Sequence, residues 1–97
     1  MYMTTSEFEV LAKTIVADKM EKDYGIEICP HDLEFVWFAH ELGYKKCTLY
    51  SKELGHYYPE VTYNKDKNEI YVDIYLKQSN TKIEDKNFDR YYDLYFD

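Results

Sequence analysis

The side chains best suited to metal binding are concentrated in one part of the sequence. Both cysteines and all three histidines lie between Cys29 and His56, a window of less than a third of the 97 residues. Thiolate and imidazole are ligands that Zn²⁺ prefers, normally in a tetrahedral set of four. This window is therefore the first candidate for a site with chemistry.

The expected order of elements brings some of these ligands together. A helix over 30–42 would be about 18 Å long, and a following strand would return over a similar distance. This antiparallel step places the turn near position 56 beside the start of the helix. The candidate ligands of a structural zinc ion are Cys29, His31 and His56, with Asp32, Glu53 or a water as the fourth.

No recognised ligand spacing supports this zinc site, because the sequence has neither a CxxC pair nor two histidines three to five residues apart. The alternative is a buried thiol with two surface histidines. Catalytic signatures are also missing: no motif joins a nucleophile to a base and an orienting group. We therefore expect a protein that is not an enzyme and acts by binding a partner.

Tyrosines and acids recur on one side of the expected strands. The chain has twelve Tyr, five Phe and one Trp, more than a core of this size can hide completely. Tyrosine offers a large rigid contact area and is enriched at protein interfaces. The alternative is that these rings form cross-strand pairs or lie beneath the C-terminal segment. The predicted partner-binding residues are Tyr50, Tyr58, Glu60, Tyr71, Asp73 and Tyr75, with Tyr91, Tyr92 and Tyr95 of the C-terminal segment.

The charge balance restricts the class of partner. Twelve basic and nineteen acidic residues give a net charge of −7. An acidic chain lacks the electrostatic term that dominates nucleic-acid affinity, and anionic membranes repel it. A basic groove on another protein would attract it. No signal peptide or membrane-spanning apolar run is visible, so the expected location is the cytoplasm.

The length predicts one domain over 1–97 with an α+β fold. Ser6 and Glu9 have the spacing of a capping box, and Gly25 suits the end of a helix over 6–24. A second helix is expected over 30–42, because a proline and an acid occupy its first turn and apolar residues surround most of it.

Alternating apolar and polar residues predict three strands, over 45–51, 57–63 and 69–77. The simplest assembly is a three-stranded antiparallel meander packed on the two N-terminal helices. The tail has apolar residues at helical spacing and predicts a short amphipathic helix over 87–96.

Part of the sequence also resembles a known group of proteins. The residues that carry the resemblance are Val36-Trp37, Lys45-Lys46, the segments 60–64 and 66–71, Asp73, Tyr75 and Lys77. Over 33–77 the sequence resembles a family of small uncharacterised proteins encoded by prophages of Gram-positive bacteria. This resemblance covers less than half of the chain and supplies no catalytic residues.

Small, acidic phage proteins without catalytic motifs often resemble inhibitors of host defence. In size, charge and aromatic content this chain is similar to anti-CRISPR proteins that block type II RNA-guided nucleases. Such a nuclease holds its heteroduplex in a positively charged channel. The resemblance implies binding to a nuclease lobe in the host cytoplasm, which would block guide or target-DNA loading by steric occlusion or by DNA mimicry. The alternative is a phage regulatory or assembly protein, monomeric or homodimeric, that binds another phage protein or itself.

Overall fold

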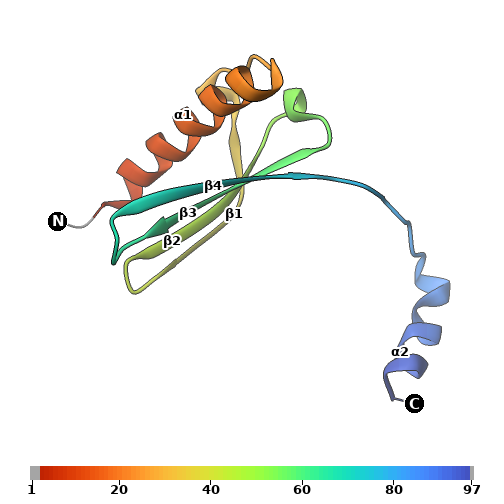
Figure 1. Cartoon of the computed structure of the whole chain (residues 1–97). Coiled ribbons are helices and arrows are strands. Elements are labelled where there is room, and N and C mark those ends of the chain that lie inside the picture. Colours follow the sequence, from red (N-terminus) through yellow and green to blue (C-terminus); the bar gives the residue numbers. More distant parts are fainter. Residues whose placement is uncertain (1–2, 97) are drawn as a thin grey trace.

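One long helix, one antiparallel sheet and a C-terminal arm make up the fold in a computed structural model, which describes residues 3–96 (Figure 1). The sheet is a meander in the order β1-β2-β3-β4. The elements are α1 (Thr5–Tyr24), η1 (Pro30–Asp32), β1 (Glu34–Glu41), β2 (Tyr44–Tyr50), η2 (Lys52–Leu54), β3 (Tyr57–Asn64), β4 (Glu69–Leu76), η3 (Asp85–Asn87) and α2 (Phe88–Phe96).

Both ends of α1 are defined by local hydrogen bonds. Thr4 and Glu7 form a capping box, in which each side chain accepts a hydrogen bond from the other residue's backbone N–H. The capping box predicted at Ser6 and Glu9 is therefore wrong by two positions. Gly25 ends the helix in the left-handed conformation, with φ of 69°, which glycine adopts without a steric penalty.

The second predicted helix, over 30–42, is wrong: residues 34–41 form the strand β1, and only Pro30–Asp32 form a single 3-10 turn. Strand β1 pairs with β2 through a turn in which Leu42 and Gly43 both have positive φ. The fold therefore has one N-terminal helix on four strands, in place of the predicted two helices on three strands.

A β-bulge explains the error in β1. The register shifts between Phe35 and Trp37, so Phe35 and Phe38 pair with the buried Leu49 and Cys47 and share one face. The rings of Phe35 and Phe38 are in contact, with centroids 5.8 Å apart. Apolar residues three positions apart imitate the period of a helix, because the bulge breaks the alternation that normally identifies a strand.

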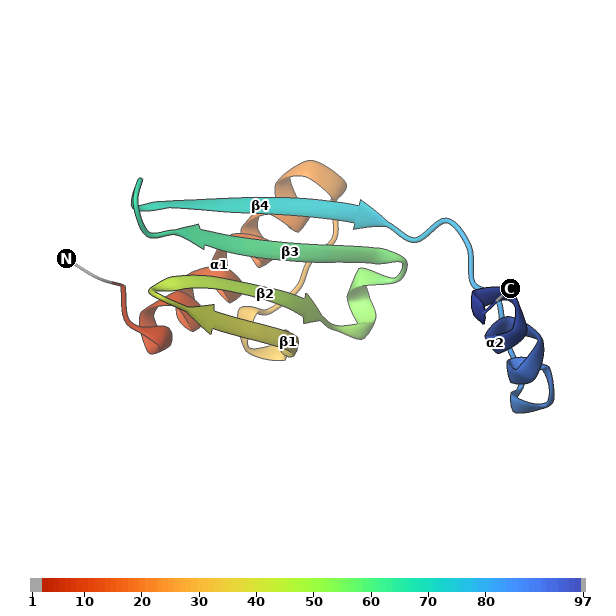
Figure 2. The same cartoon turned by 90° about the horizontal axis from the view of Figure 1, so that it is seen from below.

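Helix α1 covers one face of the sheet, which we call the inner face; the opposite face is the outer face (Figures 1 and 2). The buried core joins α1 to the strands: it contains Phe8, Ala12, Val16 and Met20 of α1 and Cys47, Leu49, Val61 and Tyr63 of the sheet. Each buried side chain of the size of Val, Leu, Met or Phe contributes about 1.5–3 kcal/mol. The exposed ion pairs of α1, such as Lys19–Asp23 at 2.8 Å, contribute far less, because solvent screens them. Apolar burial therefore fixes α1 on the sheet.

Strand β4 continues into a C-terminal arm, residues 77–96, which leaves the sheet and ends in α2 (Figure 1). Every described residue of this arm is exposed. The Cα radius of gyration is 17.1 Å, whereas a compact chain of this length would have a value of about 12.5 Å. The extended arm accounts for this difference. Within residues 3–96, neither helix combines the length and apolar character that crossing a membrane requires.

Candidate partner-binding surface

The outer face gathers the tyrosines and acids that the sequence predicts as partner-binding residues on the strands. Register pairs Tyr58 with Tyr75 and Glu60 with Asp73 across β3 and β4. Their neighbours along β3, such as Val61, are buried against α1. Because successive side chains of a strand point to opposite faces, the six predicted residues of β2, β3 and β4 all lie on the outer face. Figure 2 shows this face turned to the viewer, with α1 behind the sheet.

Two further aromatic residues belong to the outer face, although the sequence pattern did not predict them there. Trp37 of β1 pairs with Thr48, and Tyr44 of β2 pairs with Glu41, so both point away from α1. Trp37 is 50% exposed, the highest value for an aromatic ring on this face after Tyr75. Because residues 30–42 were predicted as a helix, Trp37 was not predicted to lie on the outer face. The signal that could have revealed it is the alternation of Trp37, Ala39 and Glu41 with inward-facing residues after the bulge.

Acids outnumber bases on the outer face. The register places five acids there: Glu34, Glu41, Glu60, Glu69 and Asp73. The same register places Lys46 among these acids. Lys46 forms an ion pair with Glu60 at 3.1 Å. This part-exposed pair contributes about 0.2–1 kcal/mol and leaves the surface acidic.

The tyrosine hydroxyls of the outer face fall into two groups. The Tyr71 hydroxyl donates a hydrogen bond to Glu69, and the Tyr44 hydroxyl donates one to Asp66. These hydrogen bonds raise the pKa of both tyrosines, so both rings stay neutral. Within residues 3–96, the hydroxyls of the remaining three tyrosines have no hydrogen-bond partner. Those hydroxyls, of Tyr50, Tyr58 and Tyr75, are available to a partner protein.

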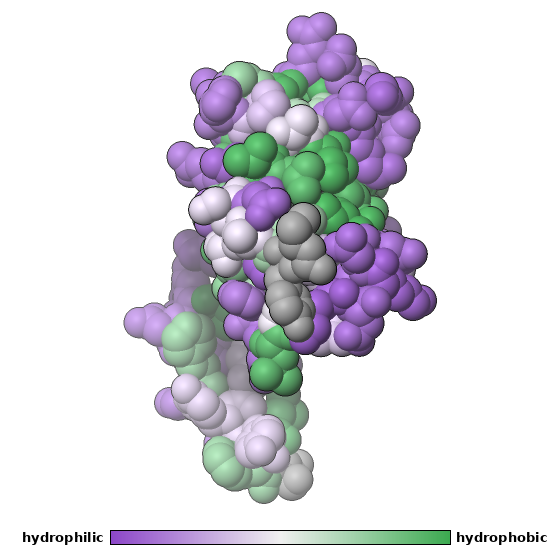
Figure 3. All heavy atoms as spheres, turned by 90° about the vertical axis from the view of Figure 1, so that its left-hand side faces the viewer, coloured by the Kyte–Doolittle hydropathy of each residue, from purple (hydrophilic) through white to green (hydrophobic). Residues whose placement is uncertain are grey.

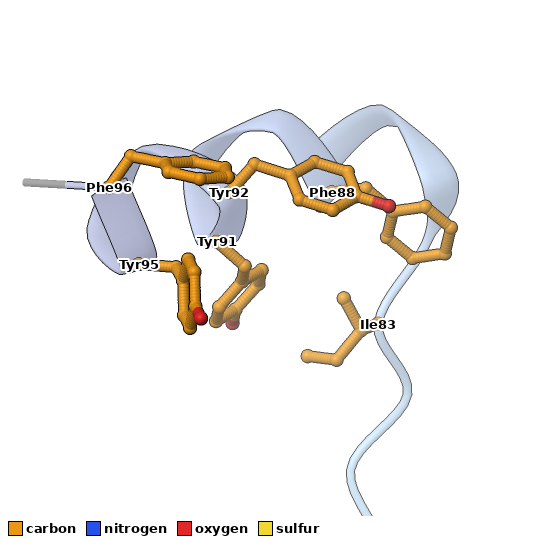
Figure 4. A pocket seen from close by; sticks show the side chains of 6 residues that line it. All are labelled: Ile83, Phe88, Tyr91, Tyr92, Tyr95 and Phe96. Carbon is orange, nitrogen blue, oxygen red and sulfur yellow. The ribbon is translucent and has the colours of Figure 1, made fainter.

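The predicted contact residues of the C-terminal segment lie apart from the outer face. Tyr91, Tyr92 and Tyr95 are on α2, at the end of the arm, so the structure does not bring them together with the tyrosines of the strands. Instead they form a second apolar surface (Figure 4). It is lined by Ile83, Phe88, Tyr91, Tyr92, Tyr95 and Phe96.

The expected zinc site is not assembled. Among residues 3–96, no group of three or more His, Cys, Asp or Glu side chains is arranged to hold a metal ion. Cys29, His31 and His56 are all exposed. The prediction depended on a helix over 30–42, and β1 changes the geometry on which it rested. Cys47 is buried between α1 and the sheet, where desolvation raises its pKa to about 11.

These features define a small α+β protein with a helix on one face of a meander sheet and an open face on the other. Residues 9–85 match the model of a family of unknown function, DUF6275, and because this match spans most of the chain, the protein belongs to that family. The matched segment contains the whole sheet and ends before α2 begins at Phe88. Neither a curated protein nor a solved structure matches the chain.

Proposed function

We propose that this chain is a protein-binding protein and that the outer face is its binding surface. The observation that carries the proposal is the set of exposed aromatic rings on this face, from Trp37 on β1 to Tyr75 on β4. Large exposed apolar groups that are contiguous and bordered by polar residues are typical of interaction sites. Tyrosine and tryptophan are also the residues that most often dominate the energy of an interface.

The outer face has a suitable size for such a contact. Eight-residue strands are about 27 Å long, and four of them side by side are about 19 Å wide. The projected area is therefore about 500 Å², and protruding side chains add to the accessible area. A typical interface buries about 800 Å² on each partner. The outer face can supply most of one such contact.

The charge of the outer face indicates the chemistry of the partner. Five acids against Lys46 favour a partner with a basic surface, which would be attracted at long range and bound less strongly at high salt. The positively charged channel of a type II RNA-guided nuclease has this character. We propose inhibition of such a nuclease, by occlusion of guide or target-DNA loading, as the specific form of this function. Self-association within a phage regulatory or assembly protein is the second candidate, and the uncovered surface of α2 favours it.

The test is a cleavage assay with purified type II nucleases, guide RNA and target DNA, in which this protein is added before or after the DNA. The proposal expects inhibition on prior addition and binding that weakens when salt rises from about 50 to 300 mM. The charge-reversed variant Asp73→Lys should inhibit less, whereas Glu21→Lys, on the exposed side of α1, should inhibit like the native protein. If a large molar excess of this protein left cleavage by several orthologous nucleases unchanged, inhibition of such a nuclease would be ruled out as its function.

A further inference from the structure

Helix α2 carries an aromatic stripe that nothing in the described chain covers. We infer that this stripe pairs with the same stripe of a second copy, so that the protein is a homodimer joined through its C-terminal arms. The stripe consists of Phe88, Tyr91, Tyr92, Tyr95 and Phe96, at the spacing that places residues on one side of a helix. Figure 4 shows Tyr91 and Tyr95 projecting side by side, on the side where Ile83 lies.

The stripe needs a cover. An isolated helix of nine residues is marginal in water, because nucleation is costly and few hydrogen bonds offset it. No residue of α2 is buried, and Tyr95 and Phe96 are 82% and 78% exposed. Tertiary contacts usually supply the stability of such a helix, and these contacts must come from outside the body of this chain, from which the arm carries α2 away (Figures 1 and 2).

Charge argues against two other covers. Helix α2 is acidic, because it carries two acids, Asp89 and Asp93, and one base, Arg90. The outer face is also acidic. Docking α2 on the outer face of a second copy would bring like charges together, which costs affinity. An anionic membrane surface is disfavoured for the same reason. Figure 3 shows green and pale residues on the arm, below a body on which purple residues surround a green patch.

Charge opposes stripe-on-stripe pairing less, because α2 carries two acids and one arginine whereas the outer face carries five acids and one lysine. At 100° per residue, Asp89, Arg90 and Asp93 fall outside the stripe, so they can remain in water when two stripes meet. A two-fold axis brings the same patch of both copies together, and such isologous contacts are the commonest arrangement in homodimers. The arm holds α2 clear of the sheet, so the bodies of the two copies do not obstruct the contact.

The available area is sufficient for a dimer. An aromatic side chain offers about 200 Å², and the five rings of the stripe are between 45% and 82% exposed. Complete burial would therefore remove about 600 Å² per copy, or about 1,200 Å² in total, which lies at the lower end of specific interfaces. We expect a dissociation constant on the order of 10 µM. The dimer would present two outer faces to a partner; it deepens the self-association named above as the second candidate function and does not depend on inhibition of a nuclease.

The first measurement is the molar mass of the full chain by light scattering and sedimentation, between about 1 and 300 µM. The native protein should change from monomer to dimer over this range. The double variant Tyr95→Ser/Phe96→Ser should raise the dissociation constant at least tenfold, with the melting of the body unchanged because α2 contributes nothing to the core. Leu94→Ser is the matched control, since Leu94 is 62% exposed on α2 but does not line the stripe.

The second measurement identifies the surface that α2 meets. In a Cys29→Ser background, Tyr92→Cys should form a disulfide-linked dimer under mild oxidation, whereas Arg90→Cys, outside the stripe, should not. A native protein that stays monomeric at the highest concentration would overturn the inference. So would a dimer insensitive to the stripe variants, or a Tyr92→Cys protein that cross-links to Thr48→Cys of the outer face but not to itself.

Discussion

Tyr58 and Tyr75 stand directly opposite each other on β3 and β4, and both rings point away from α1, with 42% and 54% of their surfaces exposed. The adjacent pair on the same face is Glu60 and Asp73. Aromatic rings and carboxylates therefore occupy successive rows of the outer face. A partner that fits one row is positioned to meet the other, so hydrophobic contact and charge act at the same place.

Replacing both rings of this pair tests the outer face. Tyr58→Ala/Tyr75→Ala should weaken partner binding by at least 30-fold, which corresponds to about 2 kcal/mol, the threshold of a hot spot. Stability should fall by only about 0.2–1 kcal/mol, because exposed cross-strand pairs contribute little. Titration calorimetry and thermal unfolding measure the two effects. Val10→Ser, which removes an exposed apolar side chain from α1, should leave binding unchanged; equal losses in both variants would contradict this assignment.

The turn between β1 and β2 stores backbone strain at Leu42, whose φ is 52°. The left-handed conformation costs about 1–2 kcal/mol for an ordinary residue and less for asparagine, and Asn-Gly is the preferred pair in such hairpins. Leu42 is 80% exposed, so its side chain contributes little burial. Leu42→Asn should therefore stabilise the protein by roughly 1 kcal/mol and raise Tm by about 4–8 °C. A Tm equal to or below that of the native protein would show that Leu42 is not strained.

The capping box makes the stability of α1 depend on pH. Hydrogen bonds from Thr4 lower the pKa of Glu7 below its ordinary value of 4.5. A carboxyl group with a depressed pKa in the folded state contributes stability above its unfolded pKa and loses it as pH falls through the folded pKa. Melting followed by circular dichroism between about pH 5 and 3 should show this loss, and Glu7→Gln should reduce it. Thr4→Ala should cost about 1 kcal/mol at neutral pH; a pH dependence identical in the native protein and Glu7→Gln would exclude this role for Glu7.

The two thiols should differ in reactivity. Cys29 is exposed, whereas Cys47 is buried and desolvation raises its pKa from 9.0 to about 11. A thiol reagent at about pH 8 should modify one cysteine quickly and the other only on unfolding, because the thiolate is the reactive species. Since the unfolded thiol ionises first as pH rises, stability should fall between about pH 9 and 11. Cys47→Ala should have a shallower alkaline slope than the native protein, with the remainder contributed by Tyr44 and Tyr71, whose pKa values are also raised; two thiols that react equally fast would contradict the burial of Cys47.

Alternation along strands made most of the sheet predictable. The predicted strands at 45–51, 57–63 and 69–77 lie within one residue of β2, β3 and β4. In each of these strands one face is buried and the other meets water, and the sequence alternates accordingly. The same alternation correctly placed six predicted contact residues on one face of the sheet, because the side-chain period in a strand is two.

Long-range geometry was not predictable in the same way. The bulge in β1 removed the alternation locally, so a helix was predicted over 30–42. That wrong helix was the basis for grouping the zinc ligands, and it hid the position of Trp37 on the outer face. The C-terminal helix was predicted from its spacing, but its position was not. No residue of α2 is buried, so its apolar spacing predicts a helix but not where that helix lies.

The open meander leaves β1 and β4 as unpaired edges, each with a row of backbone groups that could join the sheet of a neighbouring molecule. Both edge strands carry carboxylates: Glu34 and Glu41 lie on β1, and Glu69 and Asp73 lie on β4. Charged side chains on an edge strand commonly prevent such pairing between molecules. A variant with amides in place of these four carboxylates should therefore associate through its sheet edges at concentrations where the native protein does not, which sedimentation would detect.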